Sequence, residues 1–155
     1  MVYCDKETEL DLNLVFETVK NVVGVVNENL TVTLDVVDED TIHAINKKYR
    51  DVDRATDVLS FPLLTNDFTN EGNPFDVDRA TGELCLGDIY ICDKIARAQA
   101  EEYGHSYKRE FCYLFVHGLL HLFGFDHIED VDKVVMRKKE EIVMNTLNIT
   151  REDAQ

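Results

Sequence analysis

The sequence predicts an α+β domain, with about five helices packed around a small β-sheet. Segments that alternate between apolar and polar residues, as strands do, lie between segments with the apolar repeat of helices. With 155 residues, the chain is long enough for one domain with a real core and too short for two. We therefore expect a single domain over residues 1–155, with a functional site on one long helix and the turn that follows it.

A helix over residues 11–27 and a strand over residues 30–36 are predicted first. Apolar side chains recur at helical spacing through the first segment, as far as Val26. The second segment alternates strictly, which is typical of a half-buried strand. The buried face of this strand is predicted to contain Leu30, Val32, Leu34 and Val36.

A short helix, a short strand and a long loop should follow. Asp38 can cap a helix that runs to about Tyr49, because its carboxylate accepts hydrogen bonds from the first turn. The inner face of this helix is predicted to contain Ile42, Ile45 and Tyr49. Apolar residues at 58–61 indicate a strand that Pro62 ends or confines to a sheet edge. Residues 64–83 lack periodicity and predict an irregular loop, which is a lid, a substrate-contacting segment or simply mobile.

The C-terminal half is predicted to contain one strand, over residues 84–92, and three helices. The first helix covers 93–103, and the second begins after Ser106 and runs to about Phe123. The third covers 129–147, and its apolar positions are Val131, Val134, Val135, Ile142 and Val143. It also carries the basic run Arg137, Lys138 and Lys139, which is either a solvated face, with Arg137 paired to Glu141, or an RNA contact.

The segment HGLLHLFGFDH, residues 117–127, carries the chemistry. His117 and His121 are four residues apart in a helical pattern, so both imidazoles project from one face. Gly124 can end the helix and let His127 return as a third ligand. Three histidines and one open position match a catalytic zinc site. The spacing resembles HExxHxxGxxH, with Gly118 in place of the glutamate. His43 and His105 lie outside this pattern.

The net charge of −15 argues against unspecific affinity for nucleic acid. Any function on nucleic acid then needs a local basic patch, a metal ion or a protein partner. We also expect a cytoplasmic protein with reduced cysteines, because no signal peptide or membrane-spanning run is visible and the four cysteines are widely spaced.

Three segments resemble the signature blocks of the bacterial endoribonuclease YbeY family. They are YRDVDRATDVLSFP (49–62), LGDIYIC (86–92) and GHSYKREFCYLFVHGLLHLFGFDH (104–127). Ala55 and Cys92 depart from the family's usual proline and serine, and neither is a predicted ligand.

The resemblance implies a zincin-like fold with a small mixed sheet, one Zn²⁺ per chain on His117, His121 and His127, and a functional Arg50. It also implies single-strand-specific endoribonuclease activity in 16S rRNA 3′-end maturation and in ribosome quality control. The implied partners are ribosomal RNA, the small ribosomal subunit, and a basic ribosomal protein or an assembly GTPase.

The chemistry of these residues is consistent with phosphodiester cleavage. Zinc activates water, and the forked guanidinium of Arg50 suits two phosphate oxygens, with Arg54 a weaker second candidate. Gly118 removes the peptidase base and is expected to leave room for a bulky substrate. Asp57, Glu110 and Asp126 are possible bases, and none is assigned.

Two other functions stay open from the sequence. The chain is alternatively a metal-dependent hydrolase of a peptide or small ester, or a ribosome-assembly factor whose zinc is structural. Three imidazoles also suit nickel, copper or iron.

Overall fold

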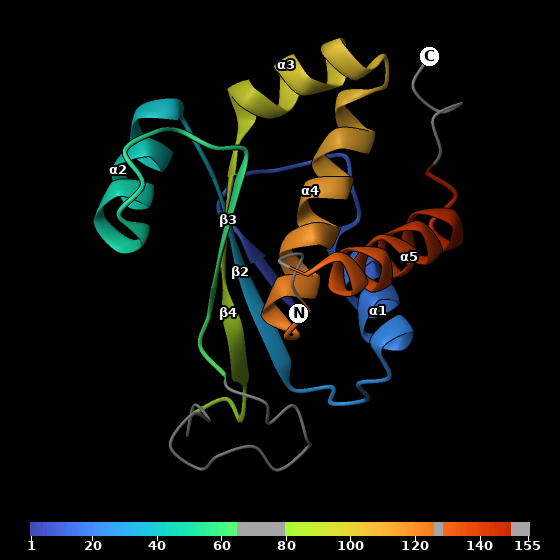
Figure 1. Ribbon diagram of the computed structural model, residues 1–155. Helices are drawn as coiled ribbons and strands as arrows, with labels where there is room; N and C mark the ends of the chain where they lie inside the picture. The colour runs from blue at the N-terminus through green and yellow to red at the C-terminus, as the bar shows by residue number, and fades with distance from the viewer. Residues whose placement is uncertain (65–79, 126–128, 150–155) are drawn as a thin grey trace.

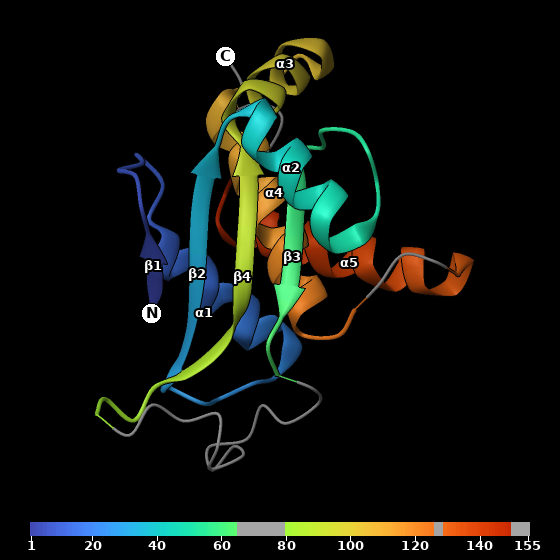
Figure 2. The same ribbon diagram turned by 90° about the vertical axis from the view of Figure 1, so that its left-hand side faces the viewer.

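The computed structural model describes residues 1–64, 80–125 and 129–149. Within these ranges the chain forms four strands and five helices, which confirms the predicted α+β class (Figures 1 and 2). In chain order the elements are β1 (Val2–Cys4), α1 (Leu12–Val23), β2 (Leu30–Val37), α2 (Glu39–Arg50), β3 (Val58–Pro62), β4 (Leu84–Cys92), α3 (Asp93–Tyr103), α4 (Tyr107–Leu122) and α5 (Asp130–Thr146).

The four strands form one mixed sheet in the order β1-β2-β4-β3 (Figure 2). β1 and β4 both run parallel to β2, and β3 runs antiparallel to β4. The apolar face predicted for β2 is buried, since Leu30, Val32 and Leu34 are completely inaccessible to solvent. A mixed sheet was expected from the family resemblance, and it is confirmed.

Helices cover the sheet unequally. Figure 1 shows α1, α4 and α5 on one face and α2 on the other. The larger core lies between the sheet and helices α1, α4 and α5. A small cluster around Ile42, Leu59 and Cys92 lies beneath α2. α4 is the central helix, because it contacts β3, β4, α1, α3 and α5. The position of α4 is therefore fixed by packing against five other elements.

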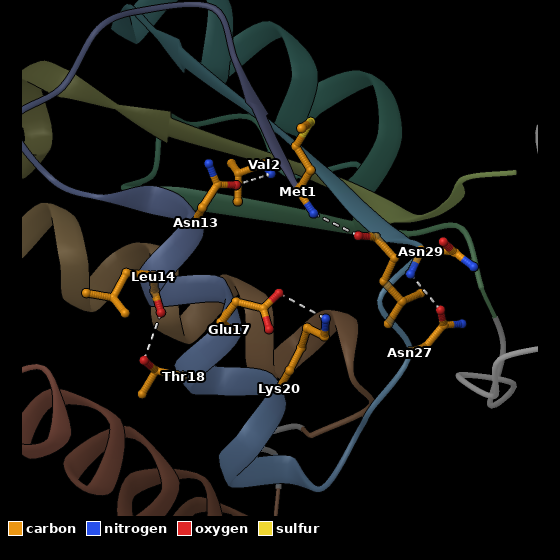
Figure 3. A network of polar contacts seen from close by, with 10 residues as sticks. Met1, Val2, Asn13, Leu14, Glu17, Thr18, Lys20, Asn27 and Asn29 are labelled. Atoms are coloured by element: carbon orange, nitrogen blue, oxygen red, sulfur yellow. Dashed lines mark hydrogen bonds and ion pairs between the residues drawn. The ribbon is translucent and has the colours of Figure 1, made fainter. Parts of the chain in front are cut away.

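Polar contacts fix the N-terminal corner (Figure 3). The backbone N–H of Val2 donates to Asn13 Oδ1 of α1 at 2.8 Å, and the amino group of Met1 donates to the Leu30 carbonyl at 2.9 Å. The buried ammonium of Lys20 is 3.0 Å from the Glu17 carboxylate. The Val2–Asn13 contact ties α1 to β1, and the Met1–Leu30 contact ties the N-terminus to β2.

The first helix is shorter than predicted, and α2 buries less than predicted. α1 ends at Val23, because Gly24 adopts a left-handed conformation with φ of 81°, and Val26 beyond it is 78% exposed. Asp38 caps α2 as expected, accepting from the Thr41 N–H at 2.7 Å. Tyr49 was wrongly placed on its inner face, since it is 63% exposed.

The inner face of α5 also differs from the prediction. Of the apolar positions expected there, only Val143 is buried, while Val131, Val134, Val135 and Ile142 are exposed. The buried residues of α5 are Met136, Glu140, Val143 and Met144. These follow one helical stripe, and the stripe was missed because an acidic residue lies in it.

The remaining predicted elements are confirmed. The strands at 58–61 and 84–92 and the helices at 93–103 and 106–123 appear within a residue or two of the expected bounds. Most of the expected loop over 64–83 lies outside the described residues. Among the helices that are described, none combines the length and the apolar character that a membrane crossing requires.

Candidate active site

Two histidines of α4 face each other across one helical turn. Ser106 begins the helix by accepting a hydrogen bond from the Arg109 N–H at 3.1 Å. The rings of His117 and His121 have centroids 4.7 Å apart and are nearly perpendicular. Their Nε2 atoms are 3.1 Å apart. The predicted i, i+4 pair therefore converges on one point.

This separation fits two ligands of one metal ion. When two nitrogens each bind Zn²⁺ at about 2.0–2.1 Å, the N–Zn–N angle sets the distance between them. For angles from about 90° to about 109°, the nitrogens lie about 2.9–3.4 Å apart. Within residues 1–64, 80–125 and 129–149, no three His, Cys, Asp or Glu side chains form a group that could hold a metal. His127, the expected third ligand, lies outside those ranges and stays a prediction.

Glu140 of α5 orients the first histidine. Nδ1 of His117 is 3.2 Å from Glu140 Oε2, and this carboxylate is 5% exposed. A carboxylate on Nδ1 fixes the tautomer and leaves Nε2 for a metal. Glu140 was missed from the sequence. Its signal was its place between Met136, Val143 and Met144 on one helical stripe.

Tyr113 packs beside the same histidine. Its ring lies 6.1 Å from that of His117, at 30°. Burial, and then the negative charge of Glu140, raise the pKa of the Tyr113 hydroxyl above its ordinary value. Like an ordinary tyrosine, it is protonated at neutral pH and can donate a hydrogen bond.

One cavity of about 430 Å³ brings Arg50 together with the histidine pair. Its polar lining residues are Arg50, Thr56, Asp57, Ser60, His117 and His121. Nη2 of Arg50 donates to the Ser60 carbonyl at 2.8 Å, and the guanidinium carbon lies 5.4 Å from the centre of the Phe61 ring. The C-terminal end of α2 and strand β3 thus hold the arginine beside α4. Arg54 does not line this cavity.

The three carboxylates considered as bases have different surroundings. Asp57 lines the cavity, and its oxygens accept from the Val58 N–H at 2.8 Å and from Gln99 at 3.3 Å. Glu110 is buried elsewhere, 2.5 Å from Nε2 of His105. Asp126 lies outside the described residues. Asp57 is therefore the one that the structure places with the histidine pair.

Gly118 faces the sheet and not the cavity. A Cβ atom at this position would be 3.1 Å from Ser60 Oγ and from two atoms of Ile89. Ser60 Oγ also donates to the Gly118 carbonyl at 3.3 Å. The expectation that the missing glutamate leaves room for a substrate was wrong, because Ser60 and Ile89 fill that space.

Gly118→Glu, which restores the HExxH glutamate, is expected to destabilise the fold without creating a peptidase. The side chain would have to displace Ile89 and bury a carboxylate, which costs about 3 kcal/mol or more. Urea unfolding followed by circular dichroism measures the loss. Gly118→Ala, which adds only the Cβ, is the size control and should cost less. A Gly118→Glu protein with the parent's unfolding midpoint would contradict this packing.

A histidine pair on a helix, packed on a small mixed sheet, is typical of metal-dependent hydrolases. Comparisons with known proteins narrow this class. The family model described as Endoribonuclease YbeY matches residues 3–148. The chain belongs to the endoribonuclease YbeY family, as the sequence motifs predicted.

Individual relatives agree over nearly the whole chain. Endoribonuclease YbeY of Agathobacter rectalis is 42% identical over 162 residues, covering 96% of this chain and 98% of that protein. Endoribonuclease YbeY of Clostridioides difficile is 47% identical over 126 residues, covering 81% and 77%. The solution structure of TM1509 from Thermotoga maritima is similar with a TM-score of 0.57 and 28% identity, covering 96% of this chain and 92% of that one.

Proposed function

We propose that this chain is a metal-dependent endoribonuclease that cleaves single-stranded RNA in 16S rRNA 3′-end maturation and ribosome quality control. It acts as one domain, residues 1–155, in the cytoplasm. RNA as the substrate class and hydrolysis as the reaction follow from membership of the endoribonuclease family. The single observation that carries the site is the cavity shared by Arg50, His117 and His121.

His117, His121 and His127 would hold one Zn²⁺. Bound zinc supplies Lewis-acid chemistry, which makes water nucleophilic at neutral pH. The protein's own contribution at this point is orientation. Glu140 holds Nδ1 of His117, so that Nε2 is directed toward His121.

Arg50 neutralises the phosphate. One of its nitrogens is anchored on the Ser60 carbonyl, which fixes the guanidinium beside the histidine pair. Its other N–H groups can bind phosphate oxygens in the forked geometry that arginine favours. Because charge accumulates on those oxygens during cleavage, a fixed cation lowers the barrier.

A partner brings the protein to its RNA. With a net charge of −15, the chain as a whole repels nucleic acid. The same charge attracts basic surfaces. We therefore propose that the enzyme meets rRNA on the small ribosomal subunit, with a basic ribosomal protein or an assembly GTPase as its contact.

Elemental analysis beside a substrate panel tests the function. We expect about one zinc per chain, and chelator-sensitive cleavage of single-stranded precursor 16S rRNA that added zinc restores. A base-paired RNA of the same sequence is the control and should resist cleavage. Turnover of peptides or esters without RNA cleavage would instead identify another hydrolase. A lower melting temperature on chelation, with no turnover at all, would identify a structural zinc.

A further inference from the structure

A second cavity adjoins the site on the other side of His117. It has a volume of about 630 Å³ and lies between the end of α3, the first half of α4 and the second half of α5. Asp57 lines both cavities. Glu140 and Tyr113 line the second cavity while contacting His117 directly. A ligand in this cavity would therefore lie next to the reaction centre.

The walls of this cavity suit a flat heteroaromatic ring. Tyr103 and Tyr113 supply aromatic surface, and Leu114 and Met144 supply buried apolar surface. Gln99 and Asn145 add amide groups that can hydrogen-bond to ring edges. Stacking on tyrosine combined with a few polar contacts is the usual way in which proteins hold an unstacked nucleobase.

The charges of the cavity separate a base from its phosphate. Three carboxylates, those of Asp57, Glu110 and Glu140, line the interior, and each already has a hydrogen-bond partner. They outnumber the one arginine inside, Arg109, whose Nη1 donates to the Ile149 carbonyl at 3.2 Å, so the interior as a whole disfavours a phosphate. Arg137 and Glu141 line the same cavity and are exposed. Both residues are among those that the structure describes, and no ion pair joins them, although the sequence suggested one. A cation for phosphate and a carboxylate for a base amino group are thus both present.

We propose that this cavity is a nucleotide subsite, which binds the base next to the scissile phosphate of single-stranded RNA. The base stacks on Tyr113, its phosphate contacts Arg137, and Glu141 accepts a hydrogen bond from its amino group. Adenine, cytosine and guanine carry such an amino group and uracil does not. A paired base cannot enter, so the subsite also selects single strands. This inference rests on the proposed function and deepens it.

A fluorescence titration tests base binding without cleavage. The chain has no tryptophan, so Tyr103→Trp places a single reporter at the cavity. We expect saturable quenching by AMP, CMP and GMP, and binding of UMP about tenfold weaker. The control is Tyr3→Trp, on the distant strand β1, which should not respond. Absence of saturable quenching, or an equal response from the control, would overturn the subsite.

Matched variants test the two contacts. Arg137→Ala should weaken binding of a single-stranded oligonucleotide about tenfold and make it less dependent on salt. Lys138→Ala removes the same charge one residue away, outside the cavity, and should change binding less than about twofold. Equal effects of the two variants would mean that only general electrostatics is involved, and the assignment would fail.

An abasic nucleotide isolates the role of Tyr113. In the parent protein, removing the base next to the cleavage position should weaken oligonucleotide binding about tenfold. In Tyr113→Ala the intact and abasic strands should bind equally, whereas Tyr113→Phe should restore the difference. A constant tenfold difference in all three proteins would place the base elsewhere.

The outcomes separate the two proposals. RNA cleavage with no base-dependent quenching and no abasic effect would leave the endoribonuclease standing and remove the subsite. Base-dependent quenching in a protein that cleaves no RNA would leave the subsite as a nucleotide site and remove the proposed function.

Discussion

Arg50→Ala is expected to abolish RNA cleavage while zinc remains bound. The guanidinium shares the cavity with His117 and His121, but it is not a metal ligand. Loss of a fixed donor to developing negative charge typically costs about 10²- to 10³-fold in rate. Arg50→Lys should recover little, because an ammonium group cannot bind two phosphate oxygens in a fork. Single-turnover cleavage of a labelled RNA, with zinc measured in the same samples, gives both quantities.

The matched control for this experiment is Arg54→Ala. Arg54 is an exposed arginine four residues further along, outside the cavity, and its replacement should leave cleavage within about twofold of the parent. Stability should change little in Arg54→Ala, because this arginine is exposed. Arg50→Ala should cost slightly more, because it also removes the hydrogen bond to the Ser60 carbonyl. Full activity of Arg50→Ala would remove the arginine from the mechanism.

His121→Ala is expected to lose both zinc and cleavage. Removing one of the three proposed ligands should reduce zinc affinity by more than the roughly 10- to 100-fold that loss of an outer partner costs. Glu140→Gln tests that outer partner, because it keeps the shape and removes the charge facing His117. The zinc affinity of Glu140→Gln should be about 10- to 100-fold lower than that of the parent. Competition with a chromogenic chelator measures the zinc affinity of the parent, of His121→Ala and of Glu140→Gln.

The control for metal binding is His43→Ala. This histidine lies on α2, where it pairs with Asp53 at 2.6 Å, away from the cavity. The zinc content and the cleavage rate of the His43→Ala protein should equal those of the parent. If His121→Ala bound zinc as tightly as this control, the ion would have to be held by other residues.

The site helix could be predicted from sequence because several independent signals coincide there. The Ser106 cap, the apolar face of α4 and the His117–His121 spacing all indicate the same helix with the same orientation. The position of Arg50 had no such local signal. Its place beside the histidines depends on β3 packing under α4, which joins segments far apart in the chain, and only the family resemblance pointed to it.

Two errors have a common physical cause. In α5 the exposed valines resemble a core face, while the buried stripe contains Glu140, whose carboxylate contacts His117. At Gly118 the missing side chain suggested open space, while the residue allows α4 to approach Ile89 closely. In both cases burial was decided by a tertiary neighbour, which hydrophobic periodicity cannot indicate.

The anchoring of Arg50 has a consequence for substrate exclusion. β3 is the last strand on its side of the described sheet. The Cys92 N–H donates to the Asp57 carbonyl, and the Leu63 N–H donates to the Leu86 carbonyl, so odd-numbered residues of β3 face β4 with their backbone groups. The backbone groups of the even-numbered residues, including the Ser60 carbonyl, therefore face away from the sheet. An extended polypeptide docks on such an edge by strand addition. Here the arginine already occupies that carbonyl, and Pro62 offers no N–H. The arginine that we propose for phosphate binding therefore also blocks this edge of the sheet to peptides.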